Sequence, residues 1–146
     1  MMTLLRRLLD LKGRARRIDY WRMQLWLTIA VSILWVSAVF LTMYGIPGWA
    51  PMLLVIPVAL LIWPVAIRRL HDRNKSGWWM LPFAVAPYLL YGLTGGLSVA
   101  AEDNPALLWP LLASSLAGFV LGLWGLIEIG FLKGTPGPNR FGPAVR

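Results

Sequence analysis

An uninterrupted apolar stretch is the feature that most limits what this chain can fold into. Residues 24–44, QLWLTIAVSILWVSAVFLTMY, contain no charged side chain. At about 1.5 Å per residue, a helix of this length crosses the roughly 30 Å hydrocarbon core of a bilayer. Three more stretches meet the same criterion. We therefore predict four transmembrane helices, at about 24–44, 49–67, 78–100 and 107–132.

Composition favours a membrane protein over a soluble one. Hydrophobic residues make up 58% of the 146 residues and charged residues 14%, whereas about a quarter of a soluble protein is charged. The net charge of +8 would suggest nucleic acid in a soluble protein. We expect no nucleic-acid partner, because membrane proteins become basic through their cytoplasmic loops. With no cysteine and one histidine, the sequence also predicts no metal site and no cofactor.

The distribution of lysine and arginine predicts the orientation of the helices. All 14 of these residues lie before the first span, between the second and third, or after the fourth. The other two connections have none, and one of them contains Glu102 and Asp103. Because Lys and Arg concentrate in cytoplasmic loops, both termini and the central loop are predicted to be cytoplasmic. The short turns predict two antiparallel hairpins, so the expected fold is an all-α, multi-pass membrane protein.

We expect residues 1–146 to form a single four-span membrane domain, with cytoplasmic segments at 1–22 and 133–146. Within the first of these segments, leucines alternate in helical phase with charged residues until Gly13 ends the pattern. This predicts a short amphipathic helix on the inner leaflet. Prolines recur inside the later spans, where a helix tolerates them if neighbouring helices cover the freed carbonyls.

The fourth span contains a stripe of small residues. Ser114, Gly118, Gly122 and Gly125 follow one another at steps of four, four and three. Such spacing lets another helix approach closely. Packing within the chain is the simpler interpretation, and a homo-oligomer contact is the alternative.

Three polar motifs fall on the predicted cytoplasmic side: GRARRIDYW (13–21), RRLHDRNKSGWW (68–79) and GTPGPNRFGP (134–143). Together they resemble domain-of-unknown-function family 805, a family of small bacterial inner-membrane proteins with four spans. The resemblance extends over nearly the whole chain and implies an inner-membrane location, but no established activity. Asn74 stands where relatives often have glycine. Because Asn adopts a left-handed turn more readily than most residues, we expect the loop to keep its shape.

His71 and Asp72 are the first candidates for chemistry, as a general base and its orienting carboxylate. Adjacent residues on a helix seldom face each other, and no nucleophile setting accompanies them. The alternative is structural: Asp72 pairs with Arg14, Arg16 or Arg69, and His71 forms a hydrogen bond across the loop. We assign no catalytic residue.

An anion site is a second hypothesis for the central loop. Asn74 or Ser76 is a plausible N-cap of the third span. We expect the amides around Gly77 to lie near four basic residues, Arg68, Arg69, Arg73 and Lys75. The phosphate of an anionic phospholipid is the expected ligand at that depth. Ordinary membrane anchoring gives the same pattern.

The tail and one intramembrane acid complete the candidates. We expect the rigid tail to fold back, with Asn139 and Arg140 as its polar groups and Arg140 near Asp19 or Asp72. Glu128 lies inside the fourth span, where a carboxylate is a functional candidate by default. Pairing with Arg22, Arg68 or Lys133 is the simpler expectation, and proton or ion handling the alternative.

Three functions remain open on the sequence alone. The preferred hypothesis is a non-enzymatic anchor or platform whose basic cytoplasmic face binds anionic lipid or a membrane or cytoplasmic protein partner. A small oligomeric transporter or channel subunit and an enzyme acting on lipid headgroups are the alternatives. The residues proposed for the binding face are Arg14, Arg68, Arg69, His71, Asp72, Asn74, Ser76, Gly77, Asn139 and Arg140.

Overall fold

The computed structural model describes residues 10–145, which form helices and turns with no named strand in that range. Four helical stretches are long and apolar enough to cross a membrane: Arg17–Met43, Trp49–Asp72, Gly77–Ala100 and Pro105–Phe131. The prediction of four apolar spans is therefore confirmed. In the most apolar part of the first span, 0% of the residues are buried. Apolar side chains this exposed require a surrounding solvent such as lipid.

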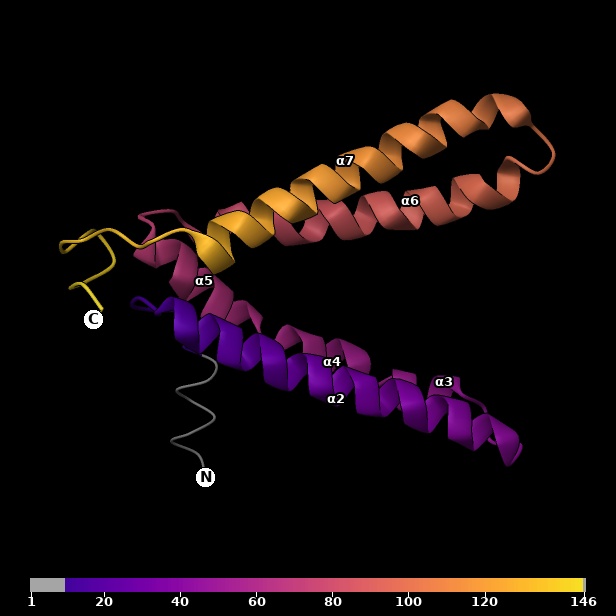
Figure 1. The fold of residues 1–146 in the computed structure, drawn as a ribbon, viewed down its shortest axis with the longest axis horizontal. Helices are drawn as coiled ribbons and strands as arrows, with labels where there is room; N and C mark the ends of the chain where they lie inside the picture. Colours follow the sequence, from indigo (N-terminus) through magenta and orange to yellow (C-terminus); the bar gives the residue numbers. More distant parts are fainter. Residues whose placement is uncertain (1–9, 146) are drawn as a thin grey trace. The chain divides into compact units, whose positions relative to one another are not determined.

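The chain divides into two compact units. Unit 1 contains Met1–Asn74 and Lys133–Arg146, and unit 2 contains Lys75–Leu132. In unit 1, the long helix α2 (Arg17–Met43) runs alongside three shorter helices, as Figure 1 shows. These are α3 (Trp49–Met52), α4 (Val55–Leu60) and α5 (Trp63–Asp72).

Prolines explain why the second span consists of three helices. A proline has no N–H for the carbonyl four residues earlier, and its ring crowds that carbonyl. For Pro57 the affected carbonyl belongs to Leu53, and for Pro64 it belongs to Leu60. The chain turns at 53–54 and again at 61–62, directly at or after these carbonyls. The interruptions therefore follow from the positions of the prolines.

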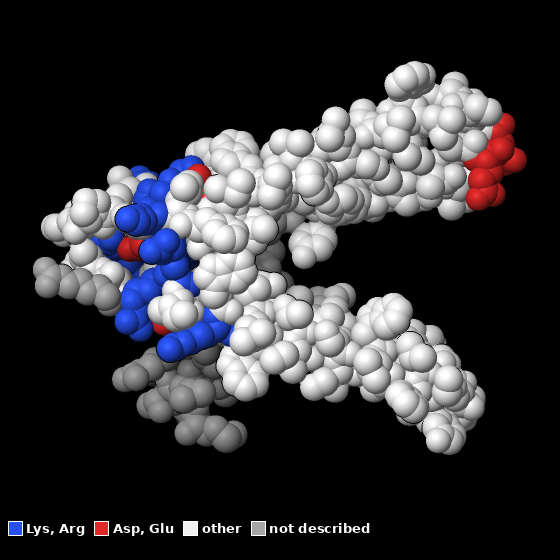
Figure 2. Space-filling view, in the orientation of Figure 1, with Lys and Arg blue, Asp and Glu red and all other residues white. Residues whose placement is uncertain are grey.

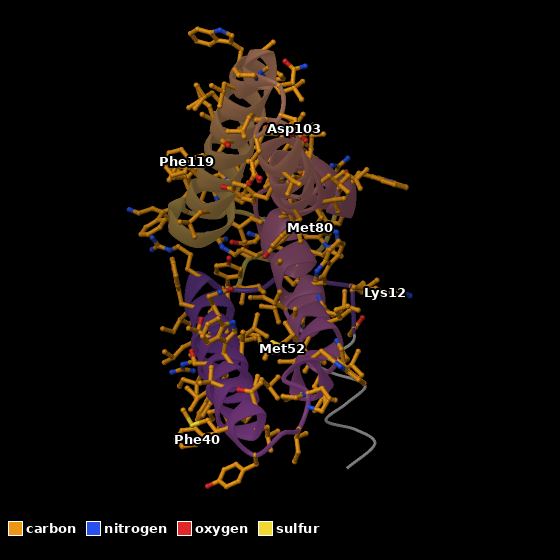
Figure 3. The ribbon with its side chains drawn as sticks, turned by 90° about the vertical axis from the view of Figure 1, so that its right-hand side faces the viewer. Lys12, Phe40, Met52, Met80, Asp103 and Phe119 are labelled. Carbon is orange, nitrogen blue, oxygen red and sulfur yellow. The ribbon has the colours of Figure 1, made fainter. Side chains whose placement is uncertain are left out.

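Unit 2 is a pair of helical stretches that lie side by side (Figure 1). The first comprises the short 3₁₀ helix η1 (Gly77–Trp79), the π-helical segment η2 (Leu81–Val85) and α6 (Ala86–Ala100). The second comprises the 3₁₀ helix η3 (Pro105–Leu107), α7 (Leu108–Leu126) and the π-helical segment η4 (Ile127–Phe131). Asp103, labelled in Figure 3, lies in the turn between the two stretches.

The stripe of small residues on α7 packs against α6 and η2. A Cβ on Gly118 would lie 3.3 Å from Leu90, and one on Gly125 only 2.7 Å from the Cβ of Phe83. The Ser114 hydroxyl lies 2.9 Å from that of Thr94 on α6. Packing within the chain, the simpler interpretation, is confirmed for these positions.

Two helices extend beyond the predicted spans. The first begins at Arg17 and the second ends at Asp72, whereas the apolar stretches begin at residue 24 and end at residue 67. Arg and Leu have high helix propensity, so a helix can continue into the charged residues that flank an apolar stretch. Residues 4–9 of the predicted amphipathic helix lie outside the described residues, and residues 10–13 are not helical.

Candidate functional site

Arg14 is the centre of a polar cluster that joins three segments of unit 1. Its Nε donates to Asp72 Oδ1 at 2.8 Å, and its Nη2 lies 2.7 Å from the same oxygen. Nη1 donates to the Gly137 carbonyl and Nη2 to the Thr135 carbonyl, both at 2.7 Å. A guanidinium has five donors in a fixed fork, so one side chain can hold a helix end and the tail together. We call Arg14, Arg69, Asp72, Thr135 and Gly137 the clasp.

Asp72 is the acceptor at which the clasp converges. Its Oδ2 accepts a hydrogen bond from Arg69, one turn earlier on α5, and its Oδ1 pairs with Arg14. The side chains of Arg14 and Arg69 are 1% and 0% exposed. The amide and hydroxyl of Thr135 donate to the Asp72 carbonyl at 2.9 and 3.1 Å. These contacts meet the requirement that buried charges be paired and hydrogen-bonded.

Gly134 allows the tail to approach this carboxylate. A Cβ built on Gly134 would overlap the Asp72 carboxyl group. A residue with any side chain would therefore push the tail away from α5 or displace Asp72. The short distance between the Gly134 backbone and the Asp72 carboxylate explains the glycine at this position, and its backbone dihedral angles do not.

The helical position of RRLHD determines which of its side chains meet. Arg69 and Asp72 are three residues apart on α5, so they share a face, whereas His71 and Asp72 are adjacent and diverge. His71 Nδ1 lies 3.1 Å from the Gly13 carbonyl, and its ring stacks on Phe141 with centroids 3.9 Å apart. This geometry matches the structural alternative for both residues. It does not favour a paired general base and carboxylate.

The tail folds back onto the end of α5, as expected. Asn139 Nδ2 donates to the His71 carbonyl at 2.9 Å, and its Oδ1 accepts from the Phe141 amide at 2.9 Å. The expected partners of Arg140 were wrong: its Nη2 donates to the Asn74 carbonyl at 3.0 Å, and its guanidinium lies over the Phe141 ring. Both oxygens of the Asp72 carboxylate are already paired, Oδ1 with Arg14 and Oδ2 with Arg69.

The start of the third span is less suited to binding an anion than we expected. Asn74 has φ +58, which confirms the left-handed turn. Ser76 precedes Gly77 at the start of η1, but its side chain makes no capping hydrogen bond. Since η1 contains three residues, it supplies little of the aligned dipole that attracts anions.

Two further arginines near the clasp have local partners. Arg16 pairs with Asp19 at 3.2 Å, one turn into α2. That side-chain hydrogen bond and the nearby negative charge raise the pKa of Arg16 above its ordinary value. Arg68 donates to the Pro64 carbonyl at 3.4 Å, while its own carbonyl accepts from the Ala15 amide at 3.1 Å. The backbone bond ties the segment before α2 to α5.

Glu128 has a partner that was not among the expected ones. Its Oε1 lies 2.9 Å from the Lys75 ammonium, and both residues belong to unit 2. The expected partners were Arg22, Arg68 and Lys133, so the pair with Lys75 was not foreseen. Structural pairing of the acid is nevertheless what the geometry shows.

Exposed cations surround the clasp. Lys12, Lys133 and Arg140 are exposed, and each belongs to a segment that contributes to the clasp or borders it. Figure 2 shows lysine and arginine gathered at the clasp end of unit 1, whereas Glu102 and Asp103 occupy the turn of unit 2. The side chains of Arg14 and Arg69 are buried. A ligand that binds at the clasp would therefore contact the exposed cations instead.

Comparison with known proteins identifies the family to which these motifs belong. The family model described as "Protein of unknown function (DUF805)" matches residues 8–143. The chain belongs to the DUF805 family. The three motifs that meet at the clasp all lie within the matched residues.

Several relatives of this DUF805 chain are proteins of Escherichia coli strain K12. "Uncharacterized protein YiiR" is 31% identical, with 97% of this chain and 89% of YiiR covered. "Inner membrane protein YhaH" is 27% identical, with 97% and 92% covered. "Inner membrane protein YhaI" is 36% identical over 58% of this chain and 70% of its own length. No solved structure matches the chain.

Sequence reasoning missed Gly134, Thr135 and Gly137 at the clasp, and in unit 2 it missed Lys75 as the partner of Glu128. Gly134 and Thr135 belong to the recognised tail motif, but a Gly/Pro-rich tail gives no signal for which residue contacts α5. Lys75 was predicted only as one of the basic residues near the possible anion site. Lys75 follows the left-handed turn at Asn74 and lies at the start of the third span. That position was the available signal that its partner differs from those of the other cations.

Proposed function

We propose that this protein is a multi-pass anchor of the bacterial inner membrane whose clasp forms a platform that binds anionic phospholipid. Its four helical stretches would cross the bilayer as two antiparallel hairpins in one membrane domain. Both termini and the 68–75 segment would lie in the cytoplasm. The names of YhaH and YhaI, both inner membrane proteins, support the location. The restriction of lysine and arginine to the terminal segments and the central connection supports the orientation.

The observation that carries this proposal is the clasp itself. It joins residues separated by as many as 123 positions into one buried polar structure. The exposed residues Lys12, Lys133 and Arg140 belong to the segments that the clasp joins. Each basic residue near an anionic surface contributes about 1 kcal/mol to binding. Three such residues on these segments would favour an anionic headgroup over a zwitterionic one.

The geometry favours this role over headgroup chemistry. The Asp72 carboxylate is held between Arg14 and Arg69, and His71 is stacked on Phe141. A general base needs access to the proton that it removes. Side chains committed to packing and buried pairs support a structural platform.

The test is native mass spectrometry with stepwise delipidation of the purified protein in detergent, after incubation with phosphatidylglycerol. The test variant carries Lys12→Gln, Lys133→Gln and Arg140→Gln. The control variant carries Glu102→Gln and Asp103→Asn, in the turn of unit 2. We expect the wild type and the control to retain phosphatidylglycerol, and the test variant to bind it about a hundredfold more weakly. Equal retention by all three proteins would refute the platform role in lipid binding.

A further inference from the structure

Unit 2 contains a group of aromatic rings built around a lysine ammonium. The Lys75 nitrogen lies 4.3 Å from the Trp79 ring centroid and 5.6 Å from that of Phe83. Trp124 meets both rings edge-on, at 6.2 Å from Trp79 and 5.2 Å from Phe83. The Glu128 carboxylate completes the surroundings at 2.9 Å from the nitrogen. We call Trp79, Phe83, Trp124 and Glu128 the cage.

The backbone around the cage is unusual in two adjacent places. Phe83 lies in η2 and Glu128 in η4, both π-helical segments, and such segments occur frequently at functional sites. Pro87 accounts for part of this, because it leaves the Phe83 carbonyl without its α-helical donor. That carbonyl faces Gly125, where a Cβ would lie 2.9 Å away. The two distortions bring a ring and a carboxylate from different helices to one ammonium.

The chemistry of the cage selects an ammonium group. Aromatic faces attract cations, and rings grouped around one nitrogen are the usual arrangement for recognising an ammonium ligand. The carboxylate adds an acceptor for an N–H donor, so a primary ammonium is bound better than a quaternary one. Glu128 is buried, with its side chain 6% exposed. A buried carboxylate is stabilised by a paired cation, and the Lys75 ammonium supplies one here.

Lys75 is held less firmly than the cations of the clasp. Its side chain is 25% exposed, against 1% for Arg14. Among the described residues its ammonium pairs with one carboxylate oxygen and two rings, whereas Arg14 reaches one carboxylate and the carbonyls of the tail. A lysine on a flexible stem can also place its ammonium in water at a membrane interface. Lys75 can therefore leave the cage if another ammonium replaces it.

We propose that the cage is a binding site for a primary ammonium ligand, which Lys75 occupies in the ligand-free protein and vacates when the ligand binds. The cage residues belong to the beginning of the third span and the end of the fourth. Headgroup amines lie at this depth of a bilayer. The ligand is the ammonium of an ethanolamine headgroup or of a soluble amine, which share the same chemistry.

The reactivity of Lys75 toward an amine-acylating reagent tests the proposal in the wild-type protein. The other lysines of the sequence, Lys12 and Lys133, are exposed and serve as internal references in the same mass spectrum. The protein is placed in nanodiscs of phosphatidylglycerol mixed equally with phosphatidylethanolamine or with a neutral galactolipid. A third sample contains the galactolipid mixture and methylammonium chloride.

We expect acylation of Lys75, relative to the reference lysines, to rise about tenfold when a competing ammonium occupies the cage. A rise with phosphatidylethanolamine alone identifies a lipid ligand. A rise with methylammonium identifies a site that also accepts soluble amines. Unchanged acylation in all three samples overturns the proposal.

A matched pair of variants connects any rise to the cage. Trp79→Leu removes the ring nearest the ammonium, whereas Trp78→Leu removes a neighbouring tryptophan that is 77% exposed. In Trp79→Leu, Lys75 should react at the high rate in every lipid, because the ring nearest its ammonium is gone. Trp78→Leu should behave as the wild type. If Trp79→Leu keeps the wild-type lipid dependence, the cage is not the site. Because the cage lies within unit 2, this result is independent of lipid binding near the clasp.

Discussion

Arg14 and Asp72, 58 residues apart in the chain, form an ion pair of 2.7 Å between two side chains that are almost fully buried. This pair connects the segment before α2 to the end of α5. Removing one member of such a pair leaves the other charge buried without compensation, which is far costlier than losing a surface ion pair. The stability of the clasp end of unit 1 therefore depends on both residues.

Asp72→Asn tests this dependence. The amide cannot compensate the two buried guanidinium groups, so we expect the free energy of unfolding to fall by about 3–5 kcal/mol. Thermal unfolding in detergent, followed by circular dichroism, measures the change. Asp103→Asn is the control, since Asp103 is exposed in the turn of unit 2. Similar melting temperatures for the two variants would contradict the importance of the pair.

Gly134→Ala tests how the tail docks. The added methyl would overlap the Asp72 carboxylate, and we expect the tail to detach from α5 at a cost of about 1–3 kcal/mol. Limited proteolysis should then remove the tail faster than in the wild type. Gly137→Ala is a matched control in the same tail, because a Cβ there meets no atom within 4 Å. Equally fast cleavage of both variants would mean that Gly134 has no special role.

A second glycine pair tests helix packing in unit 2. Gly125→Ala would place its methyl 2.7 Å from the Phe83 Cβ and 2.9 Å from the Phe83 carbonyl. We expect this overpacking to destabilise the protein by about 1–3 kcal/mol. Gly122→Ala lies 3.8 Å from Pro87, an ordinary contact, and should gain up to about 1 kcal/mol from helix propensity. Denaturation in mixed micelles compares the two, and a stable Gly125→Ala variant would refute the close approach.

The proposed orientation is testable because the natural chain contains no cysteine. Single substitutions Asp103→Cys and Val145→Cys place one thiol in the turn of unit 2 or in the tail. With a membrane-impermeant maleimide, we expect Asp103→Cys to be labelled in cells with a permeabilised outer membrane. Val145→Cys should be labelled only after the inner membrane is also opened. The reverse pattern would invert the orientation.

The spans were predictable because long apolar stretches have one common solution, a helix in lipid. Partners were harder to predict. Arg69 meets Asp72 because the two are three residues apart on one helix, but only the folded tail shows why Arg14 also meets Asp72 while Arg140 does not. The pairing of Glu128 with Lys75 depends on π-helical backbone at η4, for which the sequence offers no distinct signal.

The clasp also has a consequence for the order in which the protein matures. A ribosome makes Arg14 before the four apolar stretches, and it makes the carbonyls of Thr135 and Gly137 after them, 121 and 123 residues later. All four apolar stretches are therefore synthesised before Arg14 can reach its final acceptors. The contacts of Arg14 with the tail can therefore form only after the fourth apolar stretch has been translated. A chain truncated before residue 135 could still contain the four spans, but its Arg14 would lack both carbonyl partners.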